Sequence, residues 1–403
     1  MEFRIVRENE LNQAAALANK VFRSGMQGDM GAFFPSLFRT GISHSYGAFD
    51  QKGNLVSFMG LVPVQIRSGA ARIRAFSVGA VCTDPDSRGM GLASELLNHC
   101  REHAKRSGAS LLFISGERSL YTRAGSLAFG KASKFVIKSN SSKPLEVTGA
   151  PEIVRDMIPE DIFTVHDLLQ QRPATIEWSL QELQLFIGSA PYAGVSGLQQ
   201  HIRVAESPAG QIVAMGVFAV PMEPTKGSEV EMLVTTESQK AEKAHASPAA
   251  KADTVRNGQM LEWAGDPEVM PFLISDAVSR YQLDELLVVL PWQDTRLSEL
   301  MQQVFRALPD EQNNAGTAMI VDAAALIRHA GLSEESQSDK PSISILADSH
   351  FELHLGERTV PIDGDARLCS LLFDPNSPVL KSSGRNDIPV AVQLPYMYGL
   401  YFI

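Results

Sequence analysis

Apolar positions in the N-terminal part of the chain recur with a period of about 2 in some stretches and about 3.6 in others. The first pattern, or a fully apolar run, predicts strands at 3–7, 46–49, 55–66, 75–83 and 108–114. The second predicts a helix over 8–22 and another that begins at Leu92, with Leu92, Leu96 and Cys100 on one face. This alternation predicts an α/β (α+β) fold with mixed central sheets.

A further helical stretch carries an aromatic cluster. Its residues are Phe33, Phe34, Leu37 and Phe38. Aromatic side chains at helical spacing usually pack inward, so we interpret the cluster as core. A wall of a binding site is the alternative.

The pattern then repeats itself. Residues 153–156 and the helical stretch 160–170 mirror 5–8 and the helix that follows. The segment 203–216 mirrors 47–60, and 284–289 matches the strand run 109–114. Chance similarity of generic strands and helices is the alternative, but matched elements in the same order favour an internal duplication.

The last part of the chain has a third pattern. It predicts a strand at 318–321, a helix at 322–329, a polar linker at 333–340, strands at 342–346 and 351–355, and a helix at 366–373. Residues 388–403 are apolar and aromatic up to the last residue, so we expect the chain end to be buried or docked. We predict three domains, 1–145, 146–315 and 316–403, with a solvated loop at 238–257.

Composition narrows the classes of function. Of 403 residues, 44% are hydrophobic and 20% charged, which is typical of a globular protein. The 46 acidic and 36 basic side chains give a net charge of −10, which argues against nucleic acid or an anionic membrane as a partner. The 3 cysteines and 9 histidines show no metal-binding spacing, so we expect no metal. A charged N-terminus and the lack of an apolar run of about 18 residues predict a soluble, cytoplasmic protein.

The strongest chemical signal lies where the strand 75–83 meets the helix that begins at Leu92. Residues 88–94 read Arg-Gly-Met-Gly-Leu-Ala-Ser, with glycines at 89 and 91. The first turn of a helix presents free backbone N–H groups, and glycine lets a pyrophosphate approach them closely. Arg88 can add a charge-assisted contact. A helix-entry loop that binds nothing is the alternative.

The second copy has different residues at this turn. It reads Ala-Gly-Asp-Pro-Glu at 264–268, where Asp266 and Glu268 would repel a pyrophosphate and cap the helix, and Pro267 suits its first turn. Its last strand is followed by Pro-Trp-Gln-Asp at 291–294, without a tyrosine. We expect this copy to be structural.

The turn at 88–93 resembles the acetyl-CoA signature of the GNAT N-acetyltransferase superfamily. The element Tyr-Thr-Arg-Ala-Gly at 121–125, after the strand 108–114, resembles the tyrosine element of the same family. Over its whole length the chain is similar to acetyltransferases of the enhanced-intracellular-survival type. That resemblance implies two tandem GNAT folds, the second degenerate, and a small sterol-carrier-protein-like C-terminal domain. It also implies a homo-oligomer, for which the family suggests a hexamer.

The resemblance implies roles for particular residues. Val81, Cys82 and Thr83 would hold the pantetheine arm and thioester of acetyl-CoA, and Tyr121 would protonate the leaving thiolate. The other residues implied in cofactor binding are Arg88, Gly89, Met90, Gly91, Leu92, Ala93 and Ser94 at the pyrophosphate, together with Ser115. The base that the family implies is the C-terminal carboxylate, here that of Ile403.

The residues themselves leave the base open. The strand 75–83 contains no acid, Glu95 lies in the helix after the turn, and Glu117 is the second candidate. The apolar chain end would hold the carboxylate of Ile403 in a pocket, or it would only seal a domain interface.

The expected activity is transfer of an acetyl group from acetyl-CoA to a primary amine by direct attack, which requires a base and an acid. A non-catalytic CoA sensor or scaffold is the alternative. The acceptor would be a small-molecule or peptide amine, and aminoglycosides, polyamines, lysine side chains and metabolite amines all fit this chemistry.

Overall fold

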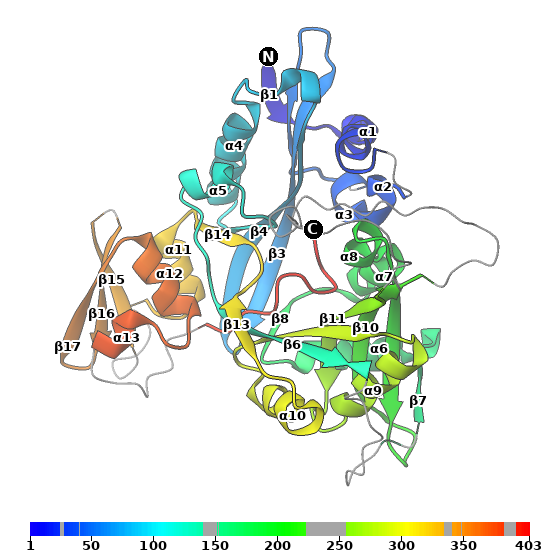
Figure 1. Cartoon of the computed structure of the whole chain (residues 1–403). Coiled ribbons are helices and arrows are strands. Elements are labelled where there is room, and N and C mark those ends of the chain that lie inside the picture. The colour runs from blue at the N-terminus through cyan, green and yellow to red at the C-terminus, as the bar shows by residue number, and fades with distance from the viewer. Residues whose placement is uncertain are drawn as a thin grey trace, which may run out of the picture.

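The computed structural model describes residues 1–24, 28–39, 41–139, 151, 153–222, 255–333, 341–347, 349–382 and 392–403. The described strands form two sheets of 7 strands and one sheet of 3. Figure 1 shows the two large sheets in neighbouring lobes, with the small sheet at the side. None of the described helices has the length and apolar character needed to cross a membrane.

The N-terminal part of the chain builds most of the first large sheet, in the order β1-β2-β3-β4-β5-β14. Its strands are β1 (Glu2–Ile5), β2 (Tyr46–Phe49), β3 (Leu55–Ser68), β4 (Ala71–Thr83), β5 (Leu111–Ile114) and β14 (Thr317–Ile320). Helices α1 (Leu11–Phe22), α2 (Met30–Phe33) and α3 (Pro35–Phe38) cover one face, and α4 (Leu92–Arg106) and α5 (Ser119–Arg123) cover the other (Figure 1).

Most sequence predictions for this half are confirmed. Leu92, Leu96 and Cys100 are all buried on one side of α4. The helix predicted over 8–22 begins with a 3-10 turn, and α1 proper starts at Leu11. Phe34 and Phe38 are buried in the core, although their stretch forms two short helices instead of one.

The second large sheet has the order β13-β6-β12-β11-β10-β9-β7. Its strands are β6 (Lys131–Lys138), β7 (Ile153–Asp156), β9 (Leu198–Glu206), β10 (Ile212–Pro221), β11 (Asn257–Gly265), β12 (Glu285–Pro291) and β13 (Asp310–Asn313). Its helices are α6 (Ile162–Gln171), α7 (Leu180–Ser189), α8 (Pro191–Val195), α9 (Met270–Arg280) and α10 (Thr295–Phe305). Strands β7 and β9 to β12 follow one another as β1 to β5 do, with one parallel pair in each sheet, which supports the duplication.

The two halves exchange strands. Strand β6 follows the first half in the chain but pairs with β12 of the second sheet. Strand β14 follows the second half but pairs with β5 of the first sheet, so the strand predicted at 318–321 does not belong with the C-terminal region. A short second-half strand, β8 (Ala174–Ile176), also pairs with β3. The domain boundaries after 145 and 315 stay a prediction, because the sheets do not follow chain order.

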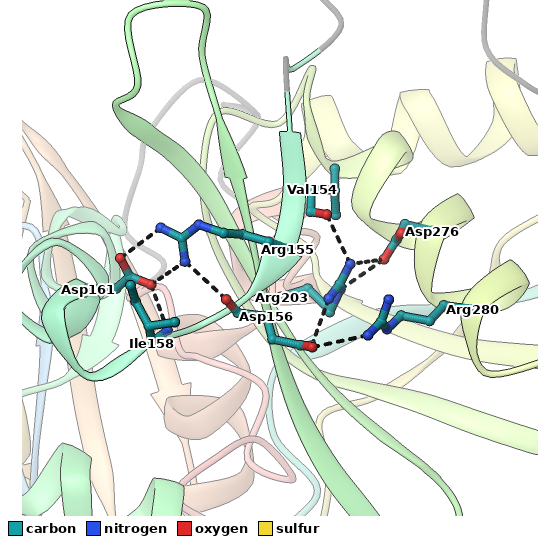
Figure 2. Close-up of polar contacts among 8 residues, drawn as sticks. All are labelled: Val154, Arg155, Asp156, Ile158, Asp161, Arg203, Asp276 and Arg280. Carbon is teal, nitrogen blue, oxygen red and sulfur yellow. Dashed lines mark hydrogen bonds and ion pairs between the residues drawn. The ribbon is translucent and has the colours of Figure 1, made fainter.

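A polar clamp recurs at the start of each half. In the first, the guanidinium of Arg4 donates to both carboxylate oxygens of Glu10, at 2.7 and 2.8 Å. In the second, Arg155 binds Asp161 in the same way, at 2.7 and 3.0 Å (Figure 2). A backbone N–H from the loop after the strand also donates to each acid.

The turn in front of α9 differs from its prediction. The helix begins at Met270, so Pro267 lies before it and Pro271 occupies the first turn. Asp266 accepts from the backbone N–H of Glu268 at 2.9 Å, which stabilises the turn and not the helix terminus itself.

The C-terminal region is a small α/β unit. Its elements are α11 (Ala323–His329), β15 (Ser342–Ala347), β16 (His350–Leu355), β17 (Arg358–Asp363), α12 (Asp365–Phe373) and α13 (Pro378–Ser382). The sequence pattern missed β17 and α13. Of the loop predicted at 238–257, residues 238–254 lie outside the described residues. Of the polar linker predicted at 333–340, residues 334–340 also lie outside them. The last residues, 392–403, leave this unit and end between the two large sheets (Figure 1).

Candidate active site

Strands β4 and β5 run parallel and then separate. They pair only over 75–78 and 111–114, whereas β4 continues to Thr83. A bulge with a positive φ of 49° at Ala80 shifts the register of β4 against β3. Bulges turn backbone groups out of the ladder. Within the described part of the chain, the edge of β4 from 79 to 83 that faces β5 has no strand partner, so an extended ligand can pair with it.

The structure places Val81, Cys82 and Thr83 on this open segment. The hydroxyl of Ser57 on β3 donates to the Cys82 carbonyl at 3.2 Å and lies 2.8 Å from the Thr83 hydroxyl. Burial raises the pKa of the Cys82 thiol to about 12. The thiol is therefore protonated at neutral pH, which argues against an acyl-cysteine intermediate.

Residues 88–94 form an open turn in front of α4. Gly89 and Gly91 adopt φ values of 80° and 73°, in the region that favours glycine. Among the described residues, the backbone N–H groups of 89–93 meet no backbone carbonyl, while those of Ser94 and Glu95 donate to Gly91 O. Adjacent free N–H groups at the positive end of a helix can bind an anion.

The side chains around this turn leave it accessible. Arg88 makes only a long contact, 3.5 Å, from Nε to the Thr83 carbonyl. Asp84 is paired with Lys20 at 2.6 Å, and this bond lowers the pKa of the Asp84 carboxyl. Arg88, Gly89, Met90, Gly91 and Ser94 are exposed, Ala93 is half-buried and Leu92 is buried.

Tyr121 lies on α5, on the face of the first sheet that α4 covers. It is 5% exposed and packs in an apolar cluster that includes Val78, Leu97 and Cys100. Burial raises the pKa of its phenol to about 12. The phenol is protonated at neutral pH, as a general acid must be.

The C-terminal carboxyl group lies against β4 on the opposite face. A Cβ added at Gly79 would lie 2.5 Å from the carboxyl carbon of Ile403 and 2.8 Å from an oxygen. Only glycine leaves this space free. The side chain of Ile403 is buried in the cluster of Phe34 and Cys82, under α1 to α3. Tyr121 and Ile403 therefore lie on opposite faces of the sheet, near the place where β4 and β5 separate.

Hydrogen bonds hold the tail that carries Ile403. Asn314 donates to the Pro395 carbonyl at 2.8 Å and accepts from the Met397 N–H at 3.0 Å. Gln293 donates to the Leu394 carbonyl at 2.8 Å. Gln293 follows β12 of the second sheet, and Asn314 lies between β13 of the second sheet and β14 of the first.

A buried ion cluster of the second half lies beside the same tail. The guanidinium of Arg172 bonds Glu262 and Asp294 at 2.6 Å each. A Cβ added at Gly399 would lie 3.1 Å from the Glu262 carboxylate. Burial, together with the nearby Glu262, raises the pKa of Tyr401 well above its ordinary value. The second half thus fixes the last residues of the chain.

Two cavities meet at the chain end. The smaller, about 20 Å³, has room for about one water and is lined by Ser77, Ser115 and Ile403 among others. The larger, about 410 Å³, extends from Ile403 between α3 and β3 on one side and β8 and α7 on the other. Among the described lining residues of both, neither Tyr121 nor Glu117 occurs.

Glu117, the second candidate base, is exposed. Burial raises the pKa of Tyr398 most, and the charge of Glu117 raises it further. Glu117 therefore lies near the tail. Sequence reasoning missed Gly79 and the tail anchors Arg172 and Asn314. A glycine inside a strand does mark a bulge or a close approach, so Gly79 carried a readable signal. Within the described residues, no group of three His, Cys, Asp or Glu side chains could hold a metal ion.

Comparison with protein families identifies the N-terminal part of the chain. The model of the acetyltransferase (GNAT) domain matches residues 2–127. These residues include β4, the turn at 88–94 and Tyr121. Residues 2–127 are therefore similar to a GNAT acetyltransferase domain. No curated protein matches the sequence.

Solved structures extend the likeness in fold to most of the chain. A probable N-acyltransferase from Enterococcus faecalis V583 has a TM-score of 0.63 at 12% identity, covering 90% of this chain and 85% of that one. Eis1 from Mycobacterium abscessus has a TM-score of 0.60 at 13% identity, with 95% and 93% covered. A GCN5-related N-acetyltransferase from Anabaena variabilis has 0.59 at 13%, with 95% and 92% covered. At such identities the likeness concerns the fold.

Proposed function

We propose that this protein is an acetyl-CoA-dependent N-acetyltransferase of the enhanced-intracellular-survival type, with the carboxylate of Ile403 as base and Tyr121 as acid. The observation that carries the proposal is the position of the C-terminal carboxyl group against Gly79, where β4 leaves β5. A carboxylate at this point meets the need for a base on a strand that has no acid of its own.

The turn at 88–94 supports the choice of donor. Its free N–H groups match a pyrophosphate, and Arg88 is exposed beside them. The open edge of β4 at Val81 to Thr83 is suited to the amide groups of a pantetheine arm, because an unpaired strand edge offers both donors and acceptors. Ser115, at the end of β5, completes the cofactor-binding residues of the proposal.

The chemistry needs two proton transfers. The neutral amine attacks the acetyl carbon, the carbon–nitrogen bond forms, and the carbon–sulfur bond breaks. The nitrogen loses a proton to the Ile403 carboxylate, and the sulfur gains one from the Tyr121 phenol. Their location on opposite faces of the sheet suits attack on one side and departure on the other, and each transfer contributes about 10²–10⁴-fold.

The remaining parts of the proposal follow the family resemblance. The second half is a degenerate GNAT fold that shapes the site of the acceptor, and the region after 316, apart from β14 in the first sheet, is the sterol-carrier-like domain. The protein would act in the cytoplasm as a homo-oligomer, a hexamer in this family, without nucleic acid or membrane as partner.

One added residue tests the base. A Gly placed after Ile403 moves the carboxylate away from Gly79, and the matched comparison is Glu117→Gln. Release of CoA thiol would be followed with a panel of primary amines at several pH values, with circular dichroism to check the fold. We expect the extended protein to lose about 10²-fold or more in turnover and Glu117→Gln to keep it.

The opposite pattern, with normal turnover in the extended protein and loss in Glu117→Gln, would make Glu117 the base. If the wild-type protein binds CoA but no amine of the panel accelerates thiol release, the protein is a CoA sensor or scaffold and the proposed activity is wrong.

A further inference from the structure

The larger cavity, which we name the acceptor cleft, has an apolar interior. It holds about 410 Å³ and ends at Tyr401 and Ile403. Its walls include Leu61 and Val64 of β3 and Ile176 of β8. Trp178, just before α7, and Leu185 and Phe186 of α7 also belong to the walls. Trp178 packs against the rings of both Phe186 and Tyr401, each with centroids 5.7 Å apart. One side of the cleft therefore belongs to the first half, and an aromatic wall comes from the second.

The acidic side chains of the cleft are already engaged. Glu177 pairs with Arg72 at 2.7 Å and lies 3.8 Å from Arg67. Glu182 accepts from the N–H and the hydroxyl of Ser179, at 2.7 and 2.9 Å, to cap α7. Beyond these two side chains, the described lining offers only the Ile403 carboxylate as a negative group.

The one cationic side chain of the described lining acts against a polycation. Arg39 lies on the α3 side of the cleft and is exposed. His44 also lines it, and burial lowers the pKa of His44, so its ring is neutral at pH 7. Besides the hydrogen-bonded Glu177 and Glu182, a ligand with several ammonium groups meets Leu, Ile and Trp walls and only the Ile403 carboxylate, which can compensate one ammonium group. Each further ammonium group would lose hydration against apolar walls.

From these walls and charges we infer that the acceptor is a small primary monoamine carried on an apolar, aromatic-sized body. This inference rests on the proposed function. The single amine reaches the Ile403 carboxylate at the inner end, and the body lies between Val64 and the Trp178 wall. A cavity of this volume suits a ligand of that size, and aromatic rings pack favourably on Trp and Phe.

Three acceptor amines, each assayed with the wild-type protein, test the proposed acceptor class. They are tryptamine, which is an aromatic monoamine, spermidine, which is a linear polyamine, and kanamycin, which is a polycationic aminoglycoside. With saturating acetyl-CoA, we expect kcat/KM for tryptamine to exceed that for either polycation by about tenfold or more, because even one methylene group of a substrate is worth about 10–200-fold in a hydrophobic pocket.

A pair of charge variants on α7 locates the binding site. Leu185, which is 41% exposed, lines the cleft, while its exposed neighbour Gln184 does not occur in the lining. We expect Leu185→Lys to raise KM for tryptamine by about fivefold or more with kcat nearly kept, because the new charge meets an apolar ligand and its ammonium. Gln184→Lys, with the same charge on the same helix, should leave both constants unchanged.

Two results would overturn the inference while the proposed function stands. One is a higher kcat/KM for spermidine or kanamycin than for tryptamine. The other is an equal response of the two lysine variants. If no amine is acetylated, calorimetry with tryptamine and the CoA-loaded protein decides. Binding that Leu185→Lys weakens and Gln184→Lys does not supports the cleft assignment, and absent binding overturns it. Failure of the proposed function is read separately, from CoA binding without any thiol release.

Discussion

The two halves of this chain carry equivalent turns between a sheet strand and a helix, yet their backbone groups differ. In the first half, the N–H groups of 89–93 have no backbone acceptor among the described residues. In the second, Glu268 N–H donates to the Asp266 side chain, and the N–H groups of Val269 and Met270 donate to the carbonyls of Asp266 and Pro267. A turn that satisfies its own donors has none left for a phosphate.

The places where the two parallel strand pairs separate differ in what lies between the strands. Strands β11 and β12 pair only over 257–260 and 285–288, so they too diverge at one end. A small pocket at this place is lined by Leu261 of β11, Val289 of β12 and Tyr396 of the tail. The chain's own tail therefore packs where the first half leaves an open edge. Under the proposed function, the turn of the first half binds the cofactor and the second half supports the tail.

The helix after each turn is also attached differently. In the first half, Tyr46 of β2 stacks on His99 of α4, with ring centroids 5.4 Å apart. In the second, Arg203 of β9, which is 1% exposed, bonds Asp156 at 2.7 Å and Asp276 of α9 at 2.9 Å (Figure 2). The ion network joins β7 and β9 to α9, which suits a structural role.

The largest expected effect separates the tyrosines of the two halves. We expect Tyr121→Phe to lower kcat by about 10²–10⁴-fold, because the thiolate then leaves without a proton. Tyr281→Phe, the same substitution at the end of α9 in the second half, should alter kcat by less than about twofold, as expected for a side chain remote from the reacting atoms. Steady-state turnover of the two folded variants measures this difference.

The same tyrosine sets a pH dependence. Because burial raises the pKa of Tyr121 to about 12, its proton-bearing form persists to higher pH than that of an ordinary tyrosine. The activity should therefore show no alkaline loss attributable to this group below about pH 10. A kcat profile in which Tyr121→Phe removes a titration near neutral pH would contradict the assignment.

The next effect concerns the tail support. Arg172→Met leaves Glu262 and Asp294 buried without their cation, so we expect the free energy of unfolding to fall by about 3–5 kcal/mol. Arg280→Met removes an exposed partner of Asp156 at 3.2 Å and should cost at most about 1 kcal/mol. Urea denaturation gives both values. Equal losses in the free energy of unfolding of the two variants would mean that the buried cluster stabilises the fold no more than an exposed ion pair does.

The cofactor turn should respond by a smaller amount. Gly91→Glu adds a negative charge and a Cβ where the backbone has φ 73°, and we expect CoA affinity to fall by at least about 2–3 kcal/mol. Gly108→Glu adds the same charge at φ 74° at the other end of α4, so it reproduces the backbone strain away from the turn. Unchanged affinity in Gly91→Glu, or equal losses in both, would remove the turn from the site.

The smallest effect lies on the surface of the second turn. Glu268 and Arg296 bond at 3.0 Å, and both side chains are about half exposed, 46% and 47%. Arg296→Ala should leave the stability nearly unchanged, because an exposed ion pair contributes little. Glu268→Gln should not create CoA binding at this turn, because its N–H groups keep their acceptors. New CoA binding in Glu268→Gln would show that the negative charge of Glu268 alone keeps CoA from binding to the second turn.

Local patterns predicted much of this molecule. The spacing of Leu92, Leu96 and Cys100 predicted the buried face of α4. The glycines at 89 and 91 indicated the open turn. The strand exchange was not predictable, because the local pattern of a strand indicates which side chains are buried but not which strand it pairs with. The approach of Ile403 to Gly79 depends on tertiary packing across the whole chain, so sequence alone gave only an apolar end and a glycine inside a strand. The start of α9 was misplaced because Pro267 serves a turn as well as a first helical turn.

The number of CoA molecules bound per chain decides whether one half binds the cofactor while the other does not. Calorimetric titration of the wild-type protein should give a stoichiometry of one, and in Gly91→Glu that single site should be lost or strongly weakened. A stoichiometry of two in the wild-type protein, or one undiminished site in Gly91→Glu, would contradict the account.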